Sequence, residues 1–174
     1  MTLNGYTLQG DSQLQRFARF CSLDDSFCFP GCVISELKIH LKNSSTPKKA
    51  ILLIGSNDLL KDTPIPDLKR DYISLVRYLL RNCDKVVLTL CPVIPRKVYE
   101  RRHWQALNYL NSLVFSFKGH HKVSIVDLKT HSSKALLKPH FFEKYFYNGR
   151  VDQLHLNKTA FYNLYQLLQT ACIE

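Results

Sequence analysis

The chain has 174 residues, 45% of them apolar, which suits one domain with a single core. Its 24 lysines and arginines against 14 acidic residues give a net charge of +10, which favours polyanionic partners such as nucleic acid or an anionic membrane surface. No run approaches the roughly 18 apolar residues of a membrane span, and the N-terminus lacks a signal-peptide pattern, so we expect one soluble, intracellular, cytoplasmic domain over residues 1–174.

Short apolar runs typical of strands alternate with segments in which apolar residues recur every three or four positions, as in helices. In chain order, the strand-like runs are residues 6–10, 26–31, 50–55, 85–91 and 122–128. The helical spacing is seen at Leu14, Phe17, Ala18 and Cys21; Ile34, Leu37 and Leu41; Tyr72, Leu75, Val76 and Leu79; Leu107, Leu110, Leu113 and Val114; and Phe161, Leu164, Tyr165 and Leu168. This alternation predicts an α/β protein, a three-layer α/β/α sandwich with a five-stranded parallel sheet.

The six cysteines lie mostly inside apolar runs, where a thiol packs as a small hydrophobic group. We therefore expect reduced core cysteines. Cys28 and Cys32 have no second close pair, which argues against a zinc site. Nothing in the chain indicates a metal or a cofactor.

Candidate functional residues follow three of the strand-like runs, and ligands of parallel sheets bind at the carboxyl ends of strands. Ser12 follows the first run, Gly31 the second and Asn57 the third. Asp152 and His155 lie three positions apart before the last helix, a spacing that lets both side chains reach one side of a turn.

Each of these residues also has a purely structural interpretation. Ser12 can be a helix N-cap, Gly31 a turn glycine, and Asn57 with Asp58 a capping pair. His155 alone can be a packed or solvated histidine. We expect Asp58 to cap the helix that follows it, and Asp11 to bond backbone near the turn.

Four short motifs resemble, in order, the motif blocks of the SGNH, or GDSL-like, hydrolases. They are GDS at 10–12, the glycine of FPG at 31, GSND at 55–58 and DQLH at 152–155. The resemblance implies the flavodoxin-like SGNH hydrolase fold and a serine esterase that acts on acyl esters. It implies that Ser12 is the nucleophile, His155 its base and Asp152 the group that orients the imidazole. The implied oxyanion hole consists of the backbone N–H groups of Ser12 and Gly31 and the side-chain amide of Asn57.

Several cations are expected to rim the same edge of the sheet. Arg16 lies about one helical turn beyond Ser12, and a basic loop follows the strand-like run at 85–91. Tyr99 and Trp104 in this loop could stack on bases if they are exposed. The residues that we expect to contact nucleic acid are Arg16, Arg96, Lys97, Arg101 and Arg102.

The size, the basic balance and the opening GDS-x-x-x-R also resemble the OSK domain at the C-terminus of Oskar, an SGNH-like domain that binds RNA without evident hydrolysis. That domain is regarded as having lost catalytic residues, whereas this chain keeps Ser12, Asp152 and His155. Esterase domains of some non-LTR retrotransposons are similar too, and there an intact triad accompanies membrane association. Ester hydrolysis, RNA binding and hydrolysis at an anionic membrane surface all stay open, as does a lid formed by residues 129–150.

Overall fold

The centre of the fold is a parallel sheet of four strands. The computed structural model describes residues 1–127, 142–144 and 151–173, with the side chains of 143, 144 and 151–154 outside the description. The strands are β1 (Thr7–Gly10), β2 (Lys49–Leu53), β3 (Lys85–Thr89) and β4 (Val123–Val126), and they lie side by side in this order. After its first residue, each of β2 and β3 is buried at every position, because helices cover both faces of the sheet.

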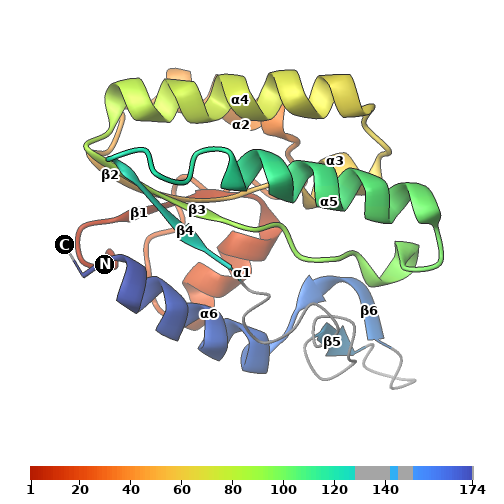
Figure 1. Ribbon diagram of the computed structural model, residues 1–174. Coiled ribbons are helices and arrows are strands. Elements are labelled where there is room, and N and C mark those ends of the chain that lie inside the picture. Colours follow the sequence, from red (N-terminus) through yellow and green to blue (C-terminus); the bar gives the residue numbers. More distant parts are fainter. Residues whose placement is uncertain (128–141, 145–150, 174) are drawn as a thin grey trace.

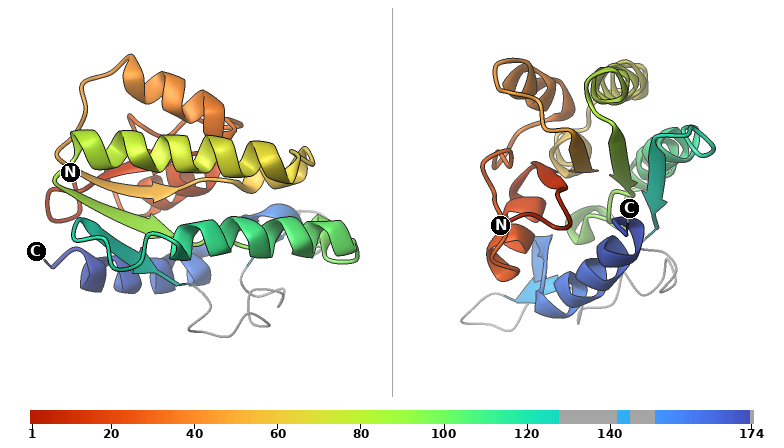
Figure 2. Two further views of the ribbon diagram at one scale, coloured as in Figure 1. Left: turned by 45° about the horizontal axis from the view of Figure 1, so that its top comes forward. Right: turned by 90° about the vertical axis from the view of Figure 1, so that its left-hand side faces the viewer.

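The helices form two layers, one on each face of the sheet (Figures 1 and 2). One layer contains α1 (Ser12–Phe20) and α6 (Lys158–Ala171), and the other contains α2 (Ile34–Lys42), α4 (Ile65–Asn82) and α5 (Arg101–Phe115). Two short helices, α3 (Ser56–Leu60) and the 3-10 helix η1 (Pro95–Lys97), follow β2 and β3. The predicted three-layer α/β/α sandwich is confirmed.

The run at 26–31 does not form the fifth full strand that its composition predicts. It makes one parallel bridge, between Cys28 and Gly10 at the end of β1. Turn-like bonds from the N–H of Cys28 to Asp25 and from the N–H of Cys32 to Phe29 close it on both sides. Because Pro30 has no N–H, the ladder cannot continue past it. The segment thus lies beside β1 as a lone bridging strand.

A second correction concerns the DQLH block, which lies in a strand and not in a turn. β5 (Phe142–Lys144) and β6 (Val151–Leu156) form an antiparallel pair, with Phe142 opposite Leu156. The alternating leucines of the sequence QLHL are the signal that could have indicated a strand. The possible lid at 129–150 lies mostly outside the described residues.

The core packs closely at the carboxyl end of β1. A Cβ atom added to Gly10 would lie 2.2 Å from the carbonyl oxygen of Leu53, so this position has no room for a side chain. Five of the six cysteines are buried, as their apolar neighbours predict. The two ends of the chain lie close together on the side where β1 begins, and there the side-chain amide of Asn4 donates to the carbonyl of Cys172 over 2.9 Å (Figure 1). No helix in the described ranges is both long and apolar enough to cross a bilayer.

Candidate active site

Ser12 and His155 lie together at the carboxyl end of β1, although 143 positions separate them in the sequence. The Oγ atom of Ser12 lies 3.1 Å from Nε2 of His155, within hydrogen-bond distance. Ser12 is the first residue of α1, where backbone N–H groups lack intrahelical acceptors and the positive end of the helix dipole lies. Asp152 lies in β6, but its side chain is outside the described residues, so its contact with His155 stays a prediction.

Asp11, and not Ser12, caps α1. The Oδ1 atom of Asp11 accepts the backbone N–H of Gln13 at 2.9 Å, which satisfies one of the open donors of the first turn. The structural interpretation of Ser12 as the N-cap is therefore wrong, and the predicted bond from Asp11 to nearby backbone is confirmed. The hydroxyl of Ser12 is free of the capping role and is directed at the imidazole.

Asn57 connects the first three motif blocks. Its Nδ2 atom donates to the carbonyl of Cys32 at 3.1 Å and lies 3.5 Å from Oδ2 of Asp11. Cys32 directly follows Gly31, so the amide of Asn57 lies between the Ser12 turn and the Gly31 turn. The longer contact is at the limit of a hydrogen bond, and the role of this amide in an oxyanion hole stays a prediction.

Gly31 is exposed and has a positive φ of +78°, in the region that favours glycine. A Cβ atom at this position would meet nothing within 4 Å. The need for glycine here is therefore conformational, and the space beside its backbone is open. The bonds from the N–H of Gly10 to Phe27 and from the N–H of Phe29 to Gly10 hold this segment beside the Ser12 turn.

Asp58 caps a different helix from the one predicted. Its Oδ2 atom accepts the backbone N–H of Ile34 at 3.0 Å, so it caps α2 from across the structure rather than the helix that follows it. Val33, the N-cap residue of α2, offers no side-chain cap, which leaves this role to Asp58. Sequence spacing could not indicate this because the two residues lie 24 positions apart.

Burial of these two carboxyl groups predicts a pH-dependent stability. Desolvation raises the pKa of Asp11 and of Asp58 from 3.8 to about 7. Between pH 4 and 7 the native state holds protons that the unfolded chain has lost, so the free energy of unfolding falls as pH rises through this window. We expect D58N, which keeps an acceptor for Ile34, to be more stable than wild type at pH 8 and to differ little at pH 4.

Urea denaturation at pH 4, 6 and 8 measures this effect. The control is D84N, which removes a carboxyl from an exposed residue. An equal stability difference between D58N and wild type at every pH would contradict the explanation.

The basic loop after β3 is only partly a cationic surface. Lys97 is 7% exposed, and its Nζ atom lies 2.7 Å from Oδ1 of the exposed Asp62, so this lysine is buried and paired and not the surface contact that the sequence predicts. Arg102 also pairs with Asp62, at 3.2 Å, and these cations hold the pKa of that carboxyl below its usual value. Glu100 lies within 3.4 Å of Arg102 and neutralises the loop further.

Other residues of this loop are exposed. Arg96 and Arg101 are on the surface, and Tyr99 is 97% exposed. Arg16, in α1, is exposed as well. Trp104 is half-buried and donates its indole N–H to the carbonyl of Val98 at 2.8 Å. The loop packs against β6 through η1, at the edge of the sheet where Ser12 lies.

The fold is that of known hydrolases. The crystal structure of a GDSL-like lipase from Bacteroides thetaiotaomicron matches with a TM-score of 0.74 and 16% identity over 95% of this chain and 86% of that chain. The crystal structure of the OSK domain of Drosophila Oskar matches with a TM-score of 0.78 and 16% identity over 95% and 87%, and that of the C-terminal domain of Drosophila Oskar with 0.81 and 17% over 97% and 88%. No curated protein matches in sequence.

The parallel sheet, its two helical layers and these structural matches define an SGNH hydrolase fold. Within that class the particular family is also clear, because the family model for the OSK domain matches residues 12–142. The chain belongs to the OSK domain family.

Proposed function

We propose that the chain is an SGNH-type serine hydrolase that cleaves acyl esters through Ser12. The observation that carries the proposal is the 3.1 Å contact between Oγ of Ser12 and Nε2 of His155. A serine hydroxyl is a weak nucleophile at neutral pH, and an imidazole within hydrogen-bond distance is the base that activates it. Structural neighbours that are named for a GDSL-like lipase and an acetyl xylan esterase are in keeping with this chemistry.

The proposed reaction has two steps, acylation of Ser12 and hydrolysis of the acyl-enzyme. Oγ of Ser12 attacks the ester carbonyl carbon while His155 takes the hydroxyl proton, and the alcohol then leaves with that proton. Water, activated by the same imidazole, releases the acyl group from Ser12. Asp152 fixes the tautomer of His155, and the N–H groups of Ser12, Gly31 and Asn57 stabilise the oxyanion.

A fluorophosphonate probe tests whether Ser12 is activated. We expect the wild-type protein to be labelled at Ser12 and S12A to remain unlabelled, because a resting serine reacts very slowly with such probes. Peptide mapping by mass spectrometry identifies the modified residue. Labelling of the wild type at no more than the S12A level would contradict the hydrolase proposal.

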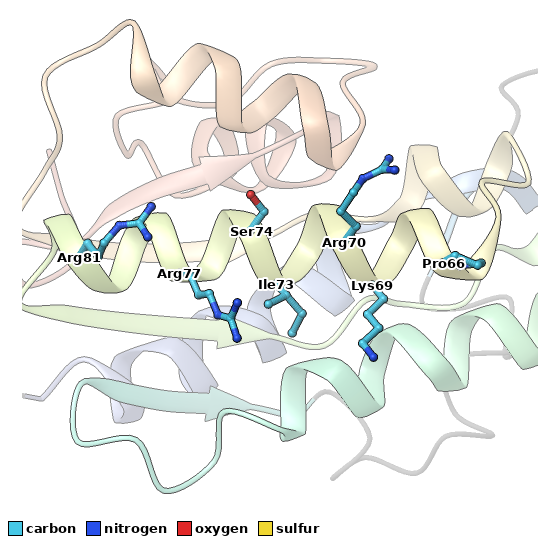
Figure 3. A pocket seen from close by; sticks show the side chains of 7 residues that line it. All are labelled: Pro66, Lys69, Arg70, Ile73, Ser74, Arg77 and Arg81. Carbon is cyan, nitrogen blue, oxygen red and sulfur yellow. The ribbon is translucent and has the colours of Figure 1, made fainter.

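A second candidate function is RNA binding, and a cationic groove along α4 favours it. The groove has a volume of about 570 Å³ on the outer face of the helix (Figure 3). Its charged lining residues are Lys69, Arg70, Arg77 and Arg81. From Lys69 to Arg81 the helix rises about 18 Å, which is long enough to follow several phosphates of one strand.

The charges of this groove are less neutralised than those of the loop after β3. Arg70 pairs with Asp67 and Asp71 at 3.1 and 3.2 Å. Among the described residues, no ion pair involves Lys69, Arg77 or Arg81. We infer that α4 rather than the Lys97 loop is the main RNA contact. Salt-dependent binding of single-stranded RNA tests this candidate.

A further inference from the structure

A second bond beside the Ser12–His155 contact connects the same two segments. Gln13 follows Ser12, and its Oε1 atom accepts the backbone N–H of Leu156, which follows His155, at 3.1 Å. The side chain of Gln13 is buried, with 2% of it exposed. Two neighbouring residues of α1 thus contact two neighbouring residues of β6.

The two bonds differ in what they can hold in place. The contact between Ser12 and His155 joins two side chains, is partly open to solvent and depends on the histidine tautomer. The bond from Leu156 to Gln13 is buried and holds the backbone of β6 itself. A buried N–H that loses its acceptor must move or find another, so the backbone next to His155 depends on Gln13.

Gln13 is itself held from both sides. Its backbone N–H donates to Asp11, which fixes the first turn of α1. On the other side, Leu156 pairs with Phe142 across the β5–β6 ladder, and Asn157 donates to the carbonyl of Phe142 at 3.1 Å while capping α6. The first turn of α1 and the end of the β5–β6 pair therefore meet at the side chain of Gln13.

We propose that Gln13 is a positioning residue that sets the distance between His155 and Ser12 by holding the backbone of β6 at Leu156. The proposal rests on the proposed hydrolase function for its catalytic consequence. Gln13 occupies the position of the last letter in the name GDSL, where leucine would offer no acceptor. The acceptor for the Leu156 N–H therefore comes from a residue in which this chain departs from the GDSL motif.

The test compares Q13L, which removes the acceptor at similar size, with Q13E, which keeps a side-chain oxygen. The matched control is Q15L, the same change two positions along α1. We expect Q13L to react with the fluorophosphonate on the order of 10- to 100-fold more slowly, because small misplacements of catalytic groups have effects of that size. For p-nitrophenyl acetate, kcat falls and KM stays the same; Q13E recovers most of the rate and Q15L matches wild type.

Nuclear magnetic resonance gives a readout that does not need activity. In wild type the amide of Leu156 should be protected from hydrogen exchange, and Q13L should increase its exchange at least tenfold and shift the ring nitrogen signals of His155. If wild type is not labelled by the fluorophosphonate, the hydrolase proposal fails, and these signals still decide whether Gln13 holds β6. An unprotected Leu156 amide in wild type, or unchanged Leu156 exchange and His155 ring signals in a folded Q13L, would overturn the inference.

Discussion

Replacing His155 by alanine is expected to reduce ester hydrolysis by a factor on the order of 10⁴ or more, to the level of S12A. The physical reason is that the imidazole of His155, 3.1 Å from the Ser12 hydroxyl, is the base that takes the hydroxyl proton in the proposed reaction. Because nucleophile and base act as one unit, the double variant S12A/H155A should be no less active than either single variant. Turnover of p-nitrophenyl butyrate measures all three.

The control for this series is H121A, which removes an exposed imidazole near the amino ends of the strands, away from Ser12. Circular dichroism shows whether each variant keeps its fold. Activity of H155A within tenfold of wild type, or activity of the double variant far below that of both single variants, would contradict a Ser12–His155 catalytic pair.

Reversing two charges on α4 should have the second large effect. We expect R77E/R81E to weaken binding of single-stranded RNA by at least tenfold at low salt, because both guanidinium groups line the exposed groove in Figure 3. The slope of log affinity against log salt should also become shallower by about 1.4, from two phosphate contacts at about 0.7 each. Fluorescence anisotropy across a salt series measures both quantities.

The matched control is R101E/R102E, a double reversal on the loop after β3. Ion pairs with Asp62 and Glu100 already neutralise Arg102, so this variant should weaken RNA binding less than the α4 variant does. Equal RNA affinity in wild type and R77E/R81E would contradict an α4 interface. Loss of binding to anionic vesicles with unchanged RNA affinity would assign the groove to a membrane surface.

The two proposed functions use different parts of the fold. Ser12 lies at the start of α1, in the helical layer on one face of the sheet, and the cationic groove lies on α4 in the other layer (Figure 2). Buried residues on the inner side of α4, Leu75 and Leu79 among them, hold that helix against the core, so changes on its outer face should leave the fold intact. S12A should therefore retain RNA binding, and R77E/R81E should retain fluorophosphonate labelling.

Local patterns in the sequence determined much of the fold. The apolar spacing of Leu14 and Phe17, or of Leu75 and Leu79, places α1 and α4 correctly because helix periodicity is a property of neighbouring residues. The continuous apolar runs place β2 and β3 correctly, because such a run is also a property of neighbouring residues. The order of the motif blocks predicted that Ser12 and His155 would meet, and their side chains do lie in contact.

Only the tertiary structure decided which polar groups are partners. The sequence predicts Lys97 to be a surface cation, but in the structure it pairs with Asp62, 35 positions away. Asp58 caps a helix whose first residue lies 24 positions earlier in the chain. The bridge at Cys28 stays short because turns close it, and the bond from Leu156 to Gln13 spans 143 positions. Periodicity reports which face of an element is apolar, but pairing of buried polar groups depends on distances between segments that no local pattern contains.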